Sequence, residues 1–183
     1  MNRKPKPRDP LTPARLERVA LRYLDRFDSS VSNLRRVLRA EVRRTSQTHE
    51  TDAQEADRWI SELLERFQSS RLLDDARYAA ALVRGLRARG ASRRAIAHKL
   101  RARGVSGTAI DAALSEGERD SRNPELEAAV ALVRRRKLGP HRESAERLAR
   151  KQKDLGVLAR AGFSLETARR ALTPPTDEDD ELF

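Results

Sequence analysis

The sequence predicts an all-α protein made of three tandem three-helix repeats that together form an elongated, curved array. The first observation is the segment 72–114, where capping residues, apolar faces and glycines follow one another as in three short helices. The second is that parts of this pattern recur on both sides of the segment. The third is composition, because 38% of the 183 residues are apolar and only 4% aromatic. Thin apolar seams between small helical units suit that composition better than one large core.

The middle repeat contains the clearest helix signals. Asp74 or Asp75 is expected to cap its first helix with a side-chain oxygen, and Gly90 is expected to end that helix. Ser92 and Ser106 are expected to cap the second and third helices. The positions spaced for burial are Ala79, Leu82, Val83, Leu86, Ile96, Leu100, Ile110, Ala113 and Leu114. Such a unit buries too little surface to stand alone, so it needs neighbours.

The first repeat begins at a Thr12–Pro13 pair. Proline suits the first helical position because its missing amide would be unpaired there. Three helices are expected, separated by residues 28–30 and by a polar loop over residues 45–52. Their predicted inward residues are Leu16, Val19, Ala20, Tyr23, Leu24 and Phe27, then Leu34, Val37, Leu38 and Val42, then Ala56, Trp59 or Ile60, Leu63, Leu64 and Phe67.

The third repeat is indicated by two echoes of the second. The sequence VALVR at 130–134 resembles AALVR at 80–84, and LARAGFS at 158–164 resembles LRARGVS at 100–106. The offset between the copies grows from 50 to 58 residues, so about eight extra residues are expected near residues 139–150. The predicted organisation is a basic disordered arm at 1–12, repeats at 13–70, 71–118 and 119–173, and a flexible acidic tail at 174–183.

Charge is distributed unevenly along the chain, whose net charge is +11. Residues 9–70 carry 11 basic and 11 acidic side chains, whereas residues 71–119 carry 11 and 5, and residues 120–173 carry 13 and 7. The last ten residues carry five acidic and no basic side chains. This pattern favours a polyanionic partner that contacts the later two thirds. The alternative is a generic solvated surface rich in arginine.

The middle repeat resembles the RecX family, regulators of the bacterial recombinase RecA. The LDD-x-RYA core and the later glycine carry the resemblance together with Ile96, Leu100, Val105, Ile110 and Leu114. We interpret the following signature residues as structural rather than catalytic: Leu73, Asp74, Asp75, Arg77, Tyr78, Ala79 and Gly104. The resemblance extends over about residues 13–173, although in the third repeat only scattered apolar and glycine positions agree.

The resemblance implies a non-enzymatic protein that binds the RecA–single-stranded DNA filament along its helical groove. Such a protein inhibits or modulates ATP hydrolysis, strand exchange and repressor self-cleavage, and so acts in DNA repair, recombination and the SOS response. A runner-up interpretation is a helical protein that binds single- or double-stranded DNA without sequence specificity and acts mainly on DNA. Its binding would weaken steeply with salt.

Basic side chains on the second and third repeats are the candidate contacts with RecA or DNA. Arginine suits both phosphate and carboxylate partners because its planar fork donates two parallel hydrogen bonds. The candidates are Arg84, Arg87, Arg93, Arg94, Lys99, Arg101 and Arg103 in the second repeat, and Arg134, Arg135, Arg136, Lys137, Arg150, Lys151 and Lys153 in the third. Each has the alternative role of keeping its helix soluble.

Catalytic, metal and membrane signals are not found in the sequence. It contains no cysteine and no glycine-rich phosphate loop, and His49, His98 and His141 do not form a metal-ligand motif. No apolar run is long enough to span a membrane, and residues 1–10 lack the core of a secretory signal. We therefore expect a cytoplasmic monomer without cofactors. The acidic tail is expected to be solvated, with competition against DNA for the basic faces as the alternative.

Overall fold

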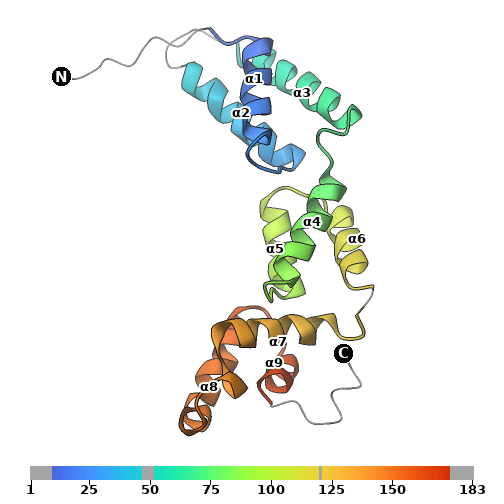
Figure 1. The fold of residues 1–183 in the computed structure, drawn as a ribbon. Coiled ribbons are helices and arrows are strands. Elements are labelled where there is room, and N and C mark those ends of the chain that lie inside the picture. The colour runs from blue at the N-terminus through green and yellow to red at the C-terminus, as the bar shows by residue number, and fades with distance from the viewer. Residues whose placement is uncertain (1–9, 47–51, 120, 174–183) are drawn as a thin grey trace, which may run out of the picture. The chain divides into compact units, whose positions relative to one another are not determined.

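The structure, a computed structural model, describes residues 10–46, 52–119 and 121–173. Within these residues it contains nine α-helices, one short 3-10 helix and no strand (Figure 1). The helices are α1 Pro13–Leu24, α2 Val31–Thr45, α3 Ala53–Ser69, α4 Asp75–Arg87, α5 Arg93–Ala102, α6 Gly107–Gly117, α7 Pro124–Arg136, η1 Gly139–His141, α8 Ser144–Arg160 and α9 Leu165–Leu172. The predicted all-α fold is confirmed. The acidic tail, most of the basic arm and most of the 45–52 loop lie outside the described residues.

The chain divides into two compact units. One comprises Met1–Tyr78 with Arg103–Val105, and the other comprises Ala79–Ala102 with Ser106–Phe183. Helices α1 to α3 belong to the first unit and α5 to α9 to the second, while α4 starts in the first and continues into the second. The three repeat boundaries and the elongated, curved shape of the array stay predictions.

The first unit has a core of aliphatic side chains from α1, α2 and α3. Leu16, Leu34, Leu38 and Ile60 are fully buried there, and Trp59 is only partly buried at its edge. Of the two predicted alternatives on α3, Ile60 is therefore the core residue. The predicted inward position of Phe27 is wrong, since its side chain is 51% exposed. The helical periodicity no longer applies to Phe27 because α1 ends at Leu24, with Asp25 as its C-cap.

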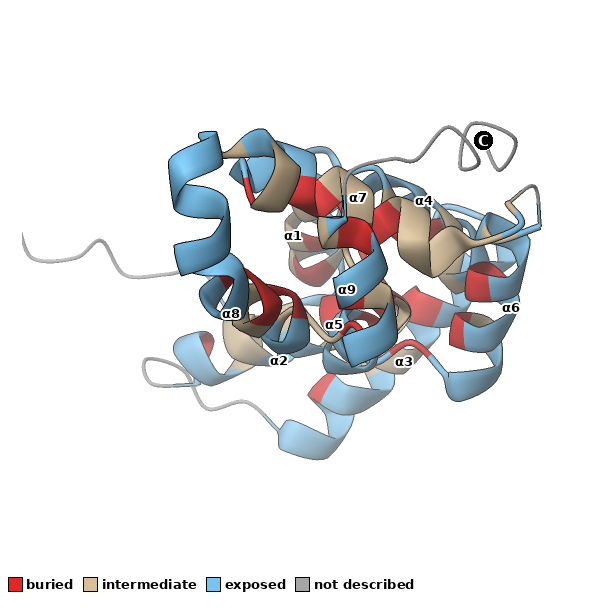
Figure 2. Ribbon diagram, turned by 90° about the horizontal axis from the view of Figure 1, so that it is seen from below, coloured by how far each residue is buried: buried red, intermediate tan, exposed pale blue. Residues whose placement is uncertain are grey.

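The second unit buries its apolar faces in two places. Leu100, Ile110 and Leu114 are buried on α5 and α6 together with Val83 of α4. A second cluster joins α7, α8 and α9 through side chains that include Leu158. Figure 2 shows buried and exposed stretches alternating along the helices of this unit. The predicted apolar faces of α5 and α6 are thus confirmed, whereas Leu82 and Leu86 of α4 are only partly buried.

A serine that caps α2 also holds a distant loop in the first unit. The Ser30 hydroxyl accepts a hydrogen bond from the Asn33 amide at 3.1 Å and donates one to the carbonyl of Arg103. Gly104, which follows, has a φ of +72°, and a Cβ atom there would lie 2.2 Å from the Ser32 hydroxyl oxygen. Glycine adopts the left-handed backbone without strain, and because it has no Cβ atom it also avoids a clash with the Ser32 side chain.

The second unit repeats the same arrangement with different residues. The hydroxyl of Ser92, the cap of α5, accepts from the Ala95 amide at 3.2 Å and donates to the Ala161 carbonyl at 2.6 Å. Gly162 follows Ala161 with a φ of +94°, and a Cβ atom there would lie 2.6 Å from the Ser92 hydroxyl oxygen. We call this combination of cap serine, carbonyl and glycine the serine–glycine joint.

Gly90 provides a further close approach between backbones in the second unit. It ends α4 with a φ of +76°, as predicted. A Cβ atom at this position would lie 2.5 Å from the Leu132 amide nitrogen and 2.7 Å from the Ala128 carbonyl oxygen, both on α7. Since helix backbone cannot move aside as a flexible side chain can, the end of α4 packs against α7 only with glycine here.

Helix α8 differs from its counterpart α5 in length, with 17 residues against 10. Residues 143–153 are all exposed, and burial begins at Asp154 and Leu155 (Figure 2). The extra residues predicted near 139–150 therefore form η1 and the first turns of α8. These turns are rich in residues with high helix propensity, which sustains the helix without a core contact.

Removing the Ser92 hydroxyl should cost more stability than removing an ordinary cap. Ser92→Ala loses the cap of α5 and the donor to Ala161, so we expect unfolding free energy to fall by about 2–3 kcal/mol. Ser106→Ala is the matched control, because Ser106 caps α6 through the Ala109 amide at 3.3 Å and is exposed. It should cost about 1 kcal/mol in chemical denaturation. Equal losses would show that the second hydrogen bond contributes nothing.

Replacing Gly85, within α4, and Gly90, at its end, by alanine should change stability in opposite directions. Gly90→Ala should destabilise by about 2 kcal/mol or more, because it adds left-handed strain and a clash with α7. Gly85→Ala should stabilise by up to about 1 kcal/mol, since a Cβ atom there meets nothing within 4 Å and alanine is the better helix former. Thermal melts of both variants would measure this, and a Gly90→Ala protein as stable as the parent would refute the close approach.

Candidate functional site

Helix α5 presents one apolar and one basic face. Ile96, Ala97 and Leu100 are buried, whereas Arg94, Lys99 and Arg101 are exposed. This separation follows from helical periodicity, because the buried residues are spaced three and four apart. None of these three cations takes part in an ion pair of the described residues, and α5 itself contains no acidic residue. The predicted basic face of the second repeat is therefore present on α5.

Part of this face lines a groove of the second unit. Arg93, Arg94 and Arg101 of α5 lie on one side, and the start of α9, with Ser164 and Thr167, lies on another. The groove also includes Asp111, Leu114, Glu125 and Gly162. Its volume is about 500 Å³. Its guanidinium groups are donors that suit an anionic group, and the carboxylates of Asp111 and Glu125 in the same lining offset part of their charge.

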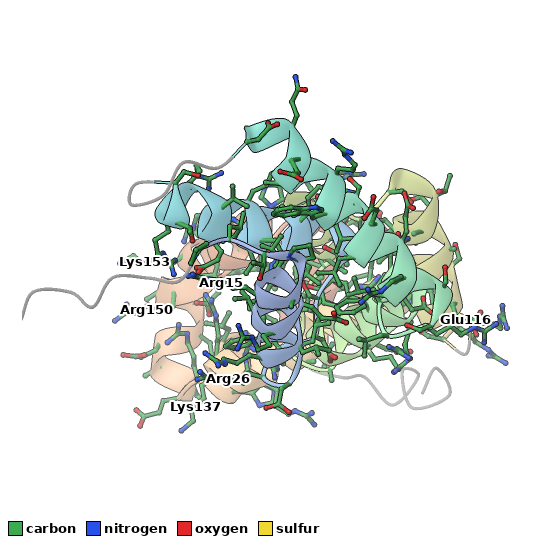
Figure 3. The ribbon with its side chains drawn as sticks, turned by 90° about the horizontal axis from the view of Figure 1, so that it is seen from above. Arg15, Arg26, Glu116, Lys137, Arg150 and Lys153 are labelled. Carbon is green, nitrogen blue, oxygen red and sulfur yellow. The ribbon has the colours of Figure 1, made fainter. Side chains whose placement is uncertain are left out.

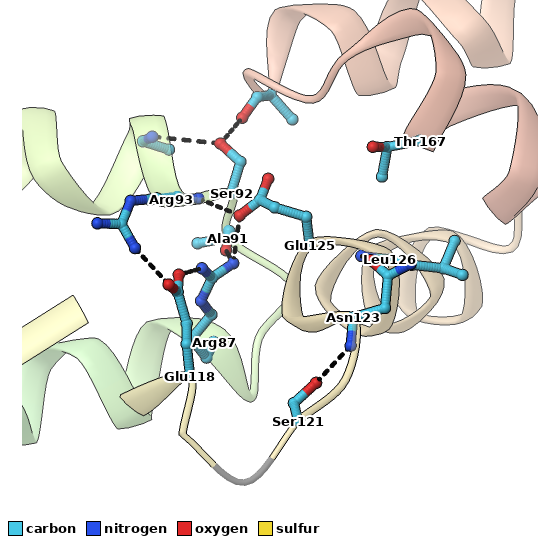
Figure 4. Close-up of polar contacts among 12 residues, drawn as sticks. Arg87, Ala91, Ser92, Arg93, Glu118, Ser121, Asn123, Glu125, Leu126 and Thr167 are labelled. Atoms are coloured by element: carbon cyan, nitrogen blue, oxygen red, sulfur yellow. Dashed lines mark hydrogen bonds and ion pairs between the residues drawn. The ribbon is translucent and has the colours of Figure 1, made fainter. Parts of the chain in front are cut away.

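Arg87 lies in an ion-pair network rather than on a free surface (Figure 4). Its guanidinium donates to the carboxylates of Glu118 and Glu125, with 2.6 Å to the Glu125 Oε1 atom. Its side chain is only 12% exposed. Arg93 joins the network by donating its side chain to Glu118 and its backbone amide to Glu125, the latter at 2.7 Å. Four charged residues from α4, α5, α7 and the segment after α6 thus bind one another.

Glu118 and Glu125 were not among the residues singled out from sequence. They lie 31 and 38 residues from Arg87, so no helical spacing connects them to it. The network cross-links the end of α4 to the start of α7. The role of Arg87 as a candidate partner contact remains a prediction, but its charge is already balanced inside the chain.

The basic residues at the end of α7 are all exposed. Arg134, Arg135 and Arg136 form the last turn, and Lys137 is the C-cap in the left-handed conformation, with a φ of +51°. The helix therefore includes the three arginines and ends before Lys137. Positive charge at this end of a helix also interacts favourably with the helix dipole.

Three further candidates lie on α8, where Arg150, Lys151 and Lys153 are exposed. The side chains of Lys137, Arg150 and Lys153 extend away from the ribbon in Figure 3. We call the exposed cations of this part of the second unit the α7–α8 cluster, namely Arg134, Arg135, Arg136, Lys137, Arg150, Lys151 and Lys153. No carboxylate pairs with any of them among the ion pairs of the described residues.

Asp154 anchors η1 to α8 and was not singled out from sequence either. Its carboxylate accepts two hydrogen bonds from Arg142 at 2.8 Å and one from the Gly139 amide at 2.9 Å. Asp154 is 1% exposed. The hydrogen bonds from Arg142 are the main reason that its pKa lies below the ordinary value, and the Gly139 amide lowers it further against the effect of burial. The sequence did offer a signal for Asp154: it lies four residues before Leu158, so the two side chains share the apolar face of the helix.

The signature residues occupy folding positions in the structure. Asp74 caps α4 by accepting from the Arg77 amide at 2.9 Å, whereas Asp75 accepts from the Val31 amide at the start of α2, also at 2.9 Å. Of the two predicted caps of α4, Asp74 is therefore the actual one. The Tyr78 hydroxyl accepts from Arg103 at 3.2 Å. Leu73 and Ala79 are buried, and the Arg77 side chain donates to the carbonyls of Arg71 and Leu72.

The described residues contain no group of three or more metal-ligating side chains. His98 and His141 are exposed, and His49 lies outside the described residues. None of the described helices is long and apolar enough to cross a membrane.

The Arg142–Asp154 pair should make stability depend on pH. A lowered pKa means that this stabilisation is present above about pH 4, the ordinary aspartate pKa, and is lost as pH falls through the lower folded value. Asp154→Asn should cost about 2–3 kcal/mol at pH 7 and flatten the acid limb of the stability curve. Asp57→Asn is the control, because Asp57 pairs with Arg39 on the surface and should change little. Urea titrations between pH 3 and 7 would measure both, and parallel curves for parent and Asp154→Asn would refute the assignment.

The chain matches known proteins over most of its length. Residues 74–114 match the family model described as RecX, second three-helix domain. The chain is 35% identical to the regulatory protein RecX of Myxococcus xanthus over 93% of this chain and 90% of that protein. It is also 35% identical to the regulatory protein RecX of Streptomyces coelicolor, over 96% of this chain and 84% of that protein.

Two solved structures resemble the fold. A crystal structure of regulatory protein RecX aligns with a TM-score of 0.59 at 22% identity, over 86% of this chain and 70% of that one. The crystal structure of RecX from Lactobacillus salivarius aligns with a TM-score of 0.60 at 19% identity, over 87% and 94%. Sequence identity above 30% across nearly the whole length, together with the matched domain, shows that the chain belongs to the RecX family.

Proposed function

We propose that this chain regulates RecA without being an enzyme, by binding the RecA–single-stranded DNA filament along its helical groove. Bound there, it inhibits or modulates ATP hydrolysis, strand exchange and repressor self-cleavage. The observation that carries the proposal is the 35% identity to a regulatory protein RecX over 93% of the chain. We infer RecA as the partner from membership of the RecX family.

The basic surfaces of the second unit support this function physically. The α5 face, with Arg94, Lys99 and Arg101, and the α7–α8 cluster both present exposed guanidinium and ammonium groups to an anionic partner. A nucleoprotein filament offers phosphates and carboxylates together, and arginine binds either with two parallel hydrogen bonds. The contact residues that we propose are Arg84, Arg94, Lys99, Arg101 and the members of the α7–α8 cluster.

Three of the candidate contact residues already have partners within the chain. Arg87 and Arg93 bind Glu118 and Glu125, and Arg103 donates to Tyr78 and is partly buried. A cation that already has a partner must lose that partner before it can bind another. We therefore assign these three to holding the helices in place.

The alternative is a protein that acts mainly on DNA, because the same cations fit phosphate equally well. Contacts to phosphate alone would be independent of sequence and would weaken with rising salt. For the regulator we propose a cytoplasmic monomer, since RecA works on cytoplasmic DNA. The two functions predict different concentrations for inhibition of RecA. A regulator of the filament inhibits before it coats the DNA, whereas a DNA-binding protein inhibits only once the DNA is saturated.

Charge reversal on α5 should weaken the effect on RecA. We expect the parent chain to inhibit ATP hydrolysis by RecA on single-stranded DNA at concentrations below those that coat the DNA. Arg94→Glu with Lys99→Glu and Arg101→Glu should raise the concentration needed by about tenfold or more, because losing 1.4 kcal/mol of binding corresponds to a factor of ten. ATP hydrolysis during titration measures the effect.

A matched control changes the same charge elsewhere. Arg22→Glu with Arg43→Glu and Arg58→Glu alters three exposed residues of α1, α2 and α3 and should leave inhibition unchanged. DNA binding without RecA, measured at two salt concentrations, separates the alternatives. Inhibition that starts only when the DNA is saturated would transfer the function to DNA binding, and equal losses in both triple variants would refute the α5 surface.

A further inference from the structure

The strongest unexplained surface is a groove between α8, α9 and η1, all within the second unit. Its volume is about 390 Å³. Its lining is partly apolar, with Leu148, Leu155 and Leu172, and partly basic, with Arg147, Lys151 and Arg169. Leu148 is 88% exposed although it is a large aliphatic residue on an otherwise charged stretch of helix. An exposed apolar side chain flanked by cations indicates a ligand that is both acidic and apolar.

The single acidic side chain in the lining does not reduce this preference. Asp154 is neutralised by two hydrogen bonds from Arg142 and is buried. Arg147 donates to the carbonyls of Arg142 and Pro140, both at 3.0 Å, so its charge has no acidic partner there. Lys151 and Arg169 are exposed. The groove therefore presents three uncompensated positive charges.

The chain itself contains a segment with the complementary chemistry. Residues 174–183, PPTDEDDELF, carry five acidic side chains, no basic one, and an apolar Leu-Phe end. The segment is attached at Thr173, which is itself a lining residue of the groove. Attachment at the groove gives this segment a high local concentration that no free acidic peptide has.

The length of the segment is sufficient. Ten residues can extend at most about 33–36 Å, whereas ten residues of α-helix, such as the exposed turns of α8, cover about 15 Å. The acidic run can therefore pass Arg169 and Lys151 and bring Leu182 and Phe183 to Leu148.

We propose that residues 174–183 bind in this groove and cover part of the α7–α8 cluster. The acidic side chains pair with Arg147, Lys151 and Arg169, and the Leu-Phe end packs on Leu148 and Leu155. The occupied groove withholds Lys151 from an external polyanion, so that a partner must displace the segment. This inference concerns the chain alone and does not depend on RecA.

A paramagnetic label tests the proposal because the chain contains no cysteine. Glu181→Cys carries a nitroxide near the end of the segment and keeps four acidic residues and the Leu-Phe end. In the ¹⁵N-labelled full chain, we expect the amide signals of Arg147, Leu148 and Lys151 to lose most of their intensity. At 1 M salt, where the screening length falls to about 3 Å, the signals should recover.

The control carries the same nitroxide on residues 174–183 with the acidic side chains neutralised. Glu181→Cys combined with Asp177→Asn, Glu178→Gln, Asp179→Asn and Asp180→Asn reports the broadening that attachment alone produces. The proposal predicts much weaker broadening of the α8 signals in this control and in Glu181→Cys combined with Arg147→Glu, Lys151→Glu and Arg169→Glu. Equal broadening in the charged and neutral segments would overturn it. Broadening in a mixture of ¹⁵N-labelled chain and separate nitroxide-labelled chain would also overturn it, because the occupant would then be a second copy.

Discussion

The serine–glycine joint is the interaction on which the helical units depend. With only 4% aromatic residues, the chain packs its helices through aliphatic side chains, and the joints add close backbone contacts to this packing. In both units a serine hydroxyl uses its two functions at once, accepting from its own helix and donating to the carbonyl before a left-handed glycine. Because the glycine has no Cβ, the loop approaches the cap closely enough for that bond. The same motif therefore ends one helix and fixes another.

Helix α8 has no cap serine that could form a serine–glycine joint. The residue that caps α8 is Glu143, and its side chain makes no capping hydrogen bond. A carboxylate accepts hydrogen bonds but cannot donate one at neutral pH, so it cannot replace Ser30 or Ser92 at a joint. The first turns of α8 are also exposed, and they carry the cations Arg147, Arg150, Lys151 and Lys153.

Local features of the fold could be predicted from sequence, whereas tertiary pairings could not. Ser92, Ser106 and Gly90 act as predicted because caps and left-handed glycines depend on neighbouring residues. Phe27 was misplaced because periodicity does not say where a helix ends, and the end of α7 at Lys137 has no glycine signal because a lysine there adopts the left-handed conformation. The partners of Arg87 lie 31 and 38 residues away, and nothing in a single sequence distinguishes this arginine from Arg84. Only the folded chain separates paired cations from free ones.

That separation decides which charges are available for function. Desolvating a cation requires compensation, so the least exposed arginines have carboxylate partners, as Arg87 has in Glu118 and Glu125. The network leaves its own region close to neutral, and the excess positive charge of the second unit is concentrated on α5, on the end of α7 and on α8. A polyanion that approaches this unit meets those surfaces first, because the field falls off within about 8–10 Å at physiological salt. The acidic segment 174–183 is attached beside one of them, at Thr173, and its five carboxylates are the nearest competitor for that surface. The two proposed contact surfaces therefore differ in their competitors within the chain: the α7–α8 cluster has the tethered acidic segment beside it, whereas the groove at α5 contains the fixed carboxylates of Asp111 and Glu125.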